Sequence, residues 1–409
     1  MKKAICRTVL ENSVFEHEPF LFFNFRKILS LFTVMAGLYI HIPFCKKRCI
    51  YCDFYSGIDM SQKERYIRAL SREWDERCTE LGNVNIDTVY LGGGTPSQLT
   101  ISELEFLFDN LTGINWEQCK EVTIEVNPDD LTEDYVEGLV SLPVNRISMG
   151  IQSFKDSDLL FLNRRHTSLQ AIDAVKLCQA AGFENLSIDL IYGLPGQTLE
   201  SWEQNVKKAI ALKVPHISAY NLIYEEGTGL SELLRKGKVR ECDEELALQM
   251  FGLLIDMLEQ EGFEHYEISN FALPGRYSRH NTAYWQNVPY LGLGASAHSY
   301  NGYSRSWNIA DLRLYCDKIE SGGTAYTLEQ LSFDDLYNDF VLTSLRTMWG
   351  LDLDKVKFLY GNDRYMYCLQ QALIHIQSGN LSMSGKHLRL TRKGLFISDT
   401  IMSDLFYVD

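Results

Sequence analysis

Between residues 38 and 222 the chain alternates short apolar runs with longer amphipathic stretches. Six runs have the length and β-branched composition of buried strands, namely 38–42, 86–91, 121–126, 145–150, 185–191 and 216–222. Apolar residues recur at helical spacing between them, as in 61–78, 101–111 and 168–182. Because parallel strands need a crossover connection, the alternation predicts an α/β fold. Six units are too few for a closed eight-fold barrel, so we expect a partial (β/α)6 barrel.

After residue 230 the pattern changes. A helical stretch near 243–262 leads into the aromatic, loop-rich segment 265–307, and two further helical stretches, 333–356 and 381–406, follow it. A short pair of strands is expected around Leu388 to Leu390, within the second of them. Helices combined with a strand pair indicate a C-terminal, mostly helical, winged-helix-like domain. Such domains often bind DNA, but without a basic recognition helix a structural or partner-docking role is favoured here.

Composition and charge describe an ordinary globular protein. The 409 residues are 45% hydrophobic and 23% charged, with a formal net charge of −15. A charge of this sign argues against a general nucleic-acid or anionic-membrane surface. Of the ten cysteines, seven are irregularly scattered, so we expect reduced thiols and a cytoplasmic protein.

The first 34 residues precede the strand pattern. Their apolar part, 21–35, is interrupted by Asn24, Arg26 and Lys27 and is too short to span a membrane. Met35 stands directly before the first predicted strand. We therefore expect residues 1–34 to be a poorly packed extension that results from an early start codon, with an amphipathic interfacial helix as the alternative.

Three cysteines follow the first predicted strand in the spacing CxxxCxxC. Cys45, Cys49 and Cys52 can hold three irons of a [4Fe–4S] cluster and leave the fourth iron open to an outside ligand. Iron–sulfur and structural zinc sites usually have four protein ligands. Two other interpretations therefore stay open, a zinc site completed by His41 or another residue, and three unrelated thiols.

Polar residues gather at the carboxyl ends of all six predicted strands, where barrels of this kind hold their active sites. Besides the cysteines, they are GGGTPS (92–97), Glu125 with Asn127, Gln152, Asp189, and Tyr220 with Asn221. This many polar features on one rim are hard to explain as core packing, and they indicate a ligand site.

The glycine run and the carboxylates suggest what that ligand contains. GGGTPS lacks the GK[ST] of a P-loop, so its bare backbone suits an amino-acid carboxylate or amine, unless it is only a tight turn. Glu125 and Asp189 interrupt apolar strands, and a buried carboxylate needs a partner. Ribose hydroxyls or an α-amino group are suitable partners. For either residue alone, Arg146 or Arg164 inside the barrel is the alternative.

The motifs YIHIPFCKKRCIYC, GGGTPS, EVNP, GIQSF, NRRH and DLIYGLPGQT occur in this order. As a set they resemble the radical S-adenosylmethionine superfamily, and within it the branch of oxygen-independent coproporphyrinogen III oxidase and the haem chaperones. The resemblance covers about residues 36–400. It implies a radical-SAM partial barrel over 35–230, a connecting region over 231–310, and a C-terminal domain of the oxidase type over 311–409.

The resemblance also implies the cofactors and their contacts. Cys45, Cys49 and Cys52 would ligate a [4Fe–4S] cluster whose fourth iron binds the amino and carboxylate groups of S-adenosylmethionine. The implied contacts with S-adenosylmethionine are Tyr39, Tyr51, Gly93, Gly94, Thr95, Glu125, Gln152, Arg164, Asp189 and, through its backbone, Ile223.

Two places in the sequence distinguish the haem chaperones from the oxidase. The oxidase has the form CxxxCxxCxC, whereas Phe54 stands here in place of that last cysteine. HNTAYW (280–285) matches the HNxxYW signature of the haem chaperones, which implies haem binding at His280. An accessible imidazole can ligate haem iron, and Tyr284 and Trp285 offer apolar faces to a porphyrin. A surface histidine beside two packing aromatic residues is the alternative.

We therefore expect a haem chaperone that binds haem, a [4Fe–4S] cluster and S-adenosylmethionine, and that delivers haem to an acceptor, a respiratory membrane haem protein. The alternative is a radical SAM enzyme, oxygen-independent coproporphyrinogen III oxidase. We expect no nucleic-acid partner, a cluster-dependent homodimer, and a cytoplasmic protein that is peripheral at the membrane during delivery.

Overall fold

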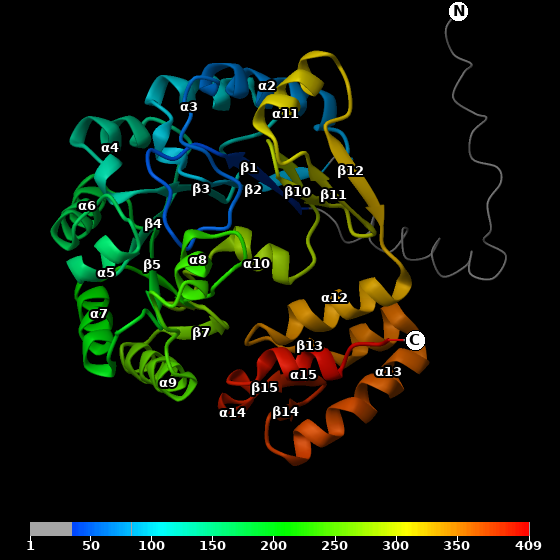
Figure 1. Ribbon diagram of the computed structural model, residues 1–409. Helices are drawn as coiled ribbons and strands as arrows, with labels where there is room; N and C mark the ends of the chain where they lie inside the picture. The colour runs from blue at the N-terminus through cyan, green and yellow to red at the C-terminus, as the bar shows by residue number, and fades with distance from the viewer. Residues whose placement is uncertain (1–34, 83, 409) are drawn as a thin grey trace, which may run out of the picture. The chain divides into compact units, whose positions relative to one another are not determined.

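Six parallel strands form the centre of a twelve-stranded sheet in the computed structural model, which describes residues 35–82 and 84–408 (Figure 1). They are β1 (Met35–Ile42), β2 (Asn85–Gly93), β3 (Glu121–Val126), β4 (Arg146–Gln152), β5 (Leu186–Tyr192) and β6 (His216–Asn221), and they lie side by side in chain order. All six predicted strands and the α/β partial barrel are confirmed. The prediction for residues 1–34 lies outside the described residues.

Helices connect these strands and cover the outside of the barrel (Figure 1). They are α2 (Lys63–Arg77), α3 (Ile101–Asn110), α4 (Glu133–Val140), α5 (Asp156–Phe161), α6 (Ser168–Ala180) and α7 (Leu199–Ala211). Three begin at a threonine in a capping box, Thr100, Thr167 and Thr198, which satisfies N–H groups that the first turn leaves free. Leu38 and Ile40 are fully buried on β1, so the centre of the sheet carries the core.

The aromatic segment after residue 230 extends the same sheet on both sides. It contains α8 (Gly229–Arg235), α9 (Glu244–Gln260), β7 (Glu264–Glu267), β8 (Asn270–Ala272), α10 (Arg279–Trp285), β9 (Tyr290–Leu293), β10 (His298–Tyr300), β11 (Ser304–Asn308), α11 (Leu312–Glu320) and β12 (Tyr326–Gln330). β9 pairs in parallel with β1, and β8 pairs antiparallel with β6. The predicted division between residues 310 and 311 falls between β11 and β12, which are hydrogen-bonded neighbours in one sheet.

The C-terminal part has its own three-stranded sheet with helices around it (Figure 1). Its elements are α12 (Phe333–Leu345), β13 (Leu351–Asp352), α13 (Leu353–Gln377), β14 (Leu381–Ser384), β15 (His387–Leu390), α14 (Arg392–Leu395) and α15 (Ser398–Asp404). The predicted strand pair lies at β14 and β15, in keeping with a winged-helix-like domain. The predicted helical stretch 333–356 is interrupted, because Gly350 takes a left-handed φ of 73° before β13. No helix in the described ranges is long and apolar enough to cross a membrane.

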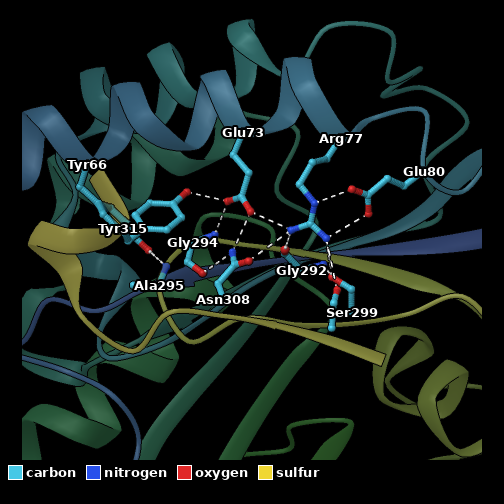
Figure 2. Close-up of polar contacts among 11 residues, drawn as sticks. Tyr66, Glu73, Arg77, Glu80, Gly292, Gly294, Ala295, Ser299, Asn308 and Tyr315 are labelled. Carbon is cyan, nitrogen blue, oxygen red and sulfur yellow. Dashed lines mark hydrogen bonds and ion pairs between the residues drawn. The ribbon is translucent and has the colours of Figure 1, made fainter. Parts of the chain in front are cut away.

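A buried ion pair joins α2 to the added strands (Figure 2). Glu73 is fully buried and accepts four hydrogen bonds, from Arg77 Nη1 (2.8 Å), the Gly294 amide (2.8 Å), Asn308 Nδ2 (2.7 Å) and the Tyr315 hydroxyl (2.5 Å). These donors come from α2, from the residue after β9, from β11 and from α11. The first crossover helix of the barrel is thereby attached to the outer strands.

The same helix also reaches the end of β1. The Tyr66 hydroxyl donates to the His41 carbonyl (2.8 Å) and accepts from the Ala295 amide (2.9 Å). His41 lies four residues before the first cysteine of the CxxxCxxC loop. The network around α2 therefore supports the strand from which that loop departs.

Candidate cofactor-binding site

The cysteine loop follows β1 and folds back on itself. The Cys45 amide donates to the Gly57 carbonyl (2.9 Å), and the Gly57 amide donates to the Pro43 carbonyl (2.8 Å). Cys45, Cys49 and Cys52 are free thiols that line one cavity. The loop thus presents three sulfur atoms to a shared space at the carboxyl end of the barrel.

That cavity has a volume of about 440 Å³ and is lined by residues at or just after the carboxyl ends of all six parallel strands. Its lining includes every predicted cluster or S-adenosylmethionine residue except Tyr39, namely Cys45, Cys49, Cys52, Tyr51, Gly93, Gly94, Thr95, Glu125, Gln152, Arg164, Asp189 and Ile223. The size lies within the range of small-molecule sites. Residues separated by almost 180 positions in the chain are thereby brought to one ligand-sized space.

The glycine run is required because the backbone there approaches the cysteine loop closely. A Cβ atom on Gly94 would lie 2.8 Å from the Ile42 carbonyl oxygen and 2.9 Å from the Phe44 nitrogen. At Gly93, where φ is 102°, a Cβ would lie 2.4 Å from the His41 ring. Thr95 Oγ1 then lies 3.3 Å from Cys45 Sγ. The run is therefore more than a tight turn, since it forms one wall of the cavity against the loop.

Of the two carboxylates of the rim, Glu125 forms no ion pair with an arginine among the described residues, whereas the charges of Arg146 and Arg164 stabilise the ionised form of Asp189. Glu125 accepts from the Tyr90 hydroxyl (2.7 Å) and the Gly93 amide (3.2 Å), so the alternative of an Arg146 or Arg164 salt bridge is wrong for this residue. Burial raises the pKa of Glu125 to about 7 and the pKa of Asp189 to about 6. Both acids therefore titrate near neutral pH, as is common for carboxylates at ligand-binding sites.

Arg164 links the cysteine loop to the ends of β3 and β4. Its Nη1 donates to Cys49 Sγ (3.3 Å), and its Nη2 donates to the Gly150 carbonyl (2.5 Å) and to Asn127 Oδ1. Its Nε is buried and has no hydrogen-bond partner within the described residues. A buried, incompletely paired guanidinium on the wall of a cavity suits an anionic or carbonyl ligand.

Gln152 ends β4 in a left-handed conformation with φ at 69°. The register between β4 and β5 shifts between Gly150 and Gln152, which marks a bulge. A left-handed conformation is uncommon for a residue other than glycine, and such conformations cluster at ligand sites. The bulge lies where Gln152 lines the cavity.

Tyr39 and Tyr51 differ in their placement. Tyr51 lines the cavity within the cysteine loop. Tyr39 does not line it. Its hydroxyl bonds His41 Nδ1 (3.0 Å) and its ring stacks on Tyr90 at 6.3 Å, beneath Glu125. Tyr39 therefore lies behind Tyr90 and is not part of the cavity wall, where the predicted contact with S-adenosylmethionine would be.

His41 does not complete a zinc site. Its Nε2 bonds the Tyr55 carbonyl (2.8 Å), and its Nδ1 bonds the Tyr39 hydroxyl. Among the described residues, no three histidine, cysteine or acidic side chains are arranged to hold a single metal ion. The zinc alternative with His41 is therefore wrong for this conformation.

The donor set fits a [4Fe–4S] cluster with an amino-acid ligand on its open iron. Three thiols line the cavity, and burial raises the pKa of Cys45 and, to about 11, that of Cys52, so these thiols keep their protons until a metal displaces them. Backbone amides of the glycine run, the Arg164 guanidinium and two carboxylates surround the remaining space.

His280 lies in α10, away from this cavity, and is buried instead of accessible. It is 1% exposed, its Nδ1 bonds Thr88 Oγ1 (2.9 Å), and its Nε2 bonds the Tyr284 hydroxyl (2.8 Å). Burial lowers the pKa of its imidazole to about 3. Its ring stacks on Tyr90 at 5.2 Å. The expectation of an accessible imidazole is therefore wrong for this conformation, because α10 turns the ring toward β2.

Further cavity residues were missed in the sequence, among them Ser148 and Gly150. They lie two positions apart on one face of β4, before the bulge at Gln152. The alternation was the signal that could have identified them, since every second residue of a strand faces the same side.

The chain has clear relatives. A family model described as the radical SAM superfamily matches residues 39–209. The heme chaperone HemW of Lactococcus lactis is 36% identical over 362 residues, which cover 86% of this chain and 94% of that protein. The heme chaperone HemW of Bacillus subtilis is 34% identical, over 80% of this chain and 87% of that protein. The coproporphyrinogen III oxidase (HemN) of Escherichia coli has the same fold, with a TM-score of 0.78 at 24% identity over 91% of this chain and 90% of that one.

Proposed function

The chain belongs to the HemW family of the radical SAM superfamily, and from this membership we propose that it is a haem chaperone that transfers haem to an acceptor haem protein. The observation that carries the proposal is identity of 36% to a heme chaperone over 94% of that relative's length. Two features of the chain agree with it, Phe54 in place of the fourth cysteine of the oxidase and the HNTAYW motif at 280–285.

We propose that the cavity at the carboxyl ends of β1 to β6 holds a [4Fe–4S] cluster and S-adenosylmethionine. Cys45, Cys49 and Cys52 would ligate three irons. Gly93, Gly94 and Thr95 would contact the methionine part, and the other contacts would come from Tyr51, Glu125, Gln152, Arg164, Asp189 and the backbone of Ile223, all lining residues of the cavity. Tyr39 would not line the cavity but would hold Tyr90 and His41 in position through its ring contact and its hydrogen bond. When bound, the cluster supplies redox chemistry at its open iron.

His280 remains our proposed haem ligand, with a condition that its burial imposes. To reach iron, its imidazole must leave Thr88 and Tyr284, at a cost of about 1 kcal/mol for each hydrogen bond. An iron–nitrogen bond offsets a cost of this size. Because burial already keeps the imidazole neutral, it needs no deprotonation to become a ligand.

The remaining partners follow from the proposed role. The acceptor would be a haem protein of a respiratory membrane complex, with the chaperone cytoplasmic and peripheral at the membrane during delivery. We propose that the cluster supports a homodimer and that nucleic acid is not a partner, in keeping with the net charge of −15. The C-terminal domain would then serve for docking, not for DNA binding.

Haem titration of the anaerobically reconstituted protein tests the proposal. We expect stoichiometric binding, detected in the Soret region, that weakens in His280→Ala. His387→Ala, which removes a half-exposed histidine of β15, is the matched control and should leave binding unchanged. Conversion of coproporphyrinogen III to protoporphyrinogen IX with reductant and S-adenosylmethionine would refute the chaperone in favour of the oxidase. Separately, Cys45→Ala should lose iron, sulfide and visible absorption, and full retention would refute the cluster.

A further inference from the structure

A second cavity, of about 360 Å³, lies at the opposite end of the barrel strands. Its wall includes the first residues of β1, Met35 and Ala36, and the early residues Asp87 and Thr88 of β2. The complete lining is Met35, Ala36, Asp87, Thr88, Lys120, Gly275, Tyr277, Arg279, Thr282, Ala283, Gln286, Val288 and Trp349. It shares no residue with the cysteine cavity, and the length of β1, ~25 Å, separates the two.

One face of α10 forms a wall of this second cavity. Arg279, Thr282, Ala283 and Gln286 recur at spacings of three and four, so they project from the same side of the helix, while His280 turns toward the barrel. The hydroxyl of Thr282 is buried there without a hydrogen-bond partner within the described residues. The HNTAYW segment thus has two faces, one packed against β2 and one open to a cavity.

Two aromatic side chains also line the cavity. Trp349 packs edge-on against Tyr277, with ring centroids 5.7 Å apart and an interplanar angle of 88°. Met35, Ala36, Ala283 and Val288 complete a mostly apolar lining. A mostly apolar lining with two aromatic rings suits an aromatic ligand.

The charged residues at the cavity favour an anion. Lys120 and Arg279 both line it, against one carboxylate, Asp87, whose Oδ2 lies 2.6 Å from Lys120 Nζ. The Arg279 guanidinium is exposed and forms no hydrogen bond or ion pair within the described part of the chain. In a protein with a net charge of −15, a cavity with two cations and one anion is a local exception.

His280 stands directly behind this cavity. Thr88 belongs to the lining, and its hydroxyl is the group that holds His280 Nδ1 at 2.9 Å. A Cβ atom on Gly37, the neighbour of the lining residue Ala36, would lie 3.2 Å from the His280 ring. A ligand in the cavity is therefore separated from the imidazole by one layer of side chains.

From these contacts we propose that this cavity is the haem-docking site, an inference that rests on the proposed function. The porphyrin lies against Trp349 and Tyr277, and the two propionates pair with Arg279 and Lys120. Thr88 forms the floor of the site, and His280 ligates the iron only after its imidazole leaves the Thr88 hydroxyl. The haem site and the cysteine cavity thus occupy opposite ends of the barrel.

Comparison of haem with its dimethyl ester, which lacks both propionate charges, tests the inference in the reconstituted full-length protein. We expect Arg279→Gln combined with Lys120→Gln to weaken haem binding about tenfold, ~1.4 kcal/mol, and to leave binding of the ester unchanged. Lys207→Gln removes an exposed lysine of α7 on the outside of the barrel and is the matched control. Ala283→Trp, which fills the cavity from α10, should reduce binding of both porphyrins, with the melting temperature checked in each variant.

The possible results distinguish failure of the proposed docking site from failure of the proposed chaperone function. If the unmodified protein binds haem and all the cavity variants bind it equally well, the docking site is refuted while the chaperone function stands. If the unmodified protein binds no haem, both are refuted. Equal loss of haem and ester in the double glutamine variant would also refute the propionate pairing.

Discussion

Replacement of Glu73 by glutamine should destabilise the protein far more than the same change on the exposed side of α2. Glu73 is fully buried and accepts four hydrogen bonds, two at each carboxylate oxygen. Glutamine keeps the volume and one acceptor oxygen. Its NH2 group must then face a pair of donors, and whichever pair it faces includes a donor that cannot reverse, the Gly294 amide or the Arg77 guanidinium (Figure 2).

The magnitude follows from the charge left behind. Removal of one partner from a buried ion pair costs about 3–5 kcal/mol. Arg77 keeps a bidentate contact with Glu80, at 2.8 and 3.0 Å, so we expect the lower end, about 3 kcal/mol. For the unit Met35–Asp409, an unfolding entropy of ~2.1 cal/mol/K per residue sums to about 0.8 kcal/mol/K. The melting temperature should therefore fall by about 4 °C.

Thermal melts of the cluster-free protein, followed by circular dichroism, measure this change. Glu64→Gln is the matched control, because Glu64 lies on the same helix in an exposed pair with Arg68 at 2.8 Å. Exposed helix pairs contribute about 0.3–0.5 kcal/mol, so the control should melt within about 1 °C of the parent protein. Equal shifts for the two variants would mean that the buried network stabilises no more than a surface pair, contrary to the burial argument.

Two further predictions concern the cysteine cavity. Because burial raises the pKa of Glu125 to about 7, its protonated form stabilises the fold at low pH, and that contribution is lost as pH rises from about 4 through 7. Glu125→Gln mimics the protonated acid, so its melting temperature should rise relative to the parent between pH 5 and pH 8, and a constant difference would contradict the assignment. Gly94→Ala should cost about 2–4 kcal/mol and lower the iron content, because its Cβ would lie 2.8 Å from a backbone oxygen. Gly57→Ala, whose Cβ meets nothing within 4 Å, should retain iron, and equal retention by both variants would show that the close approach is unnecessary.

Much of the barrel and of its site was predictable from the sequence, because the signals are local. Strand and helix periodicity repeat every two and 3.6 residues, so the six strands from β1 to β6 could be recognised without knowledge of their neighbours. The cysteine spacing and the order of the motifs predicted which residues share a rim, since the carboxyl ends of parallel strands meet at one edge. Twelve of the thirteen predicted cluster and S-adenosylmethionine residues line one cavity.

Only the tertiary structure decided the features that depend on contacts between residues far apart in the chain. Strands β7 to β12 are three to five residues long, too short for a reliable pattern, and their membership of the main sheet follows from pairing with β1 and β6. Glu73 and Arg77 have the spacing of an exposed helix pair, and their burial comes from residues more than 200 positions away. The burial of His280 likewise results from packing of α10 on β2. Periodicity is a property of neighbouring residues, whereas burial and pairing are set by contacts that the chain makes only when folded.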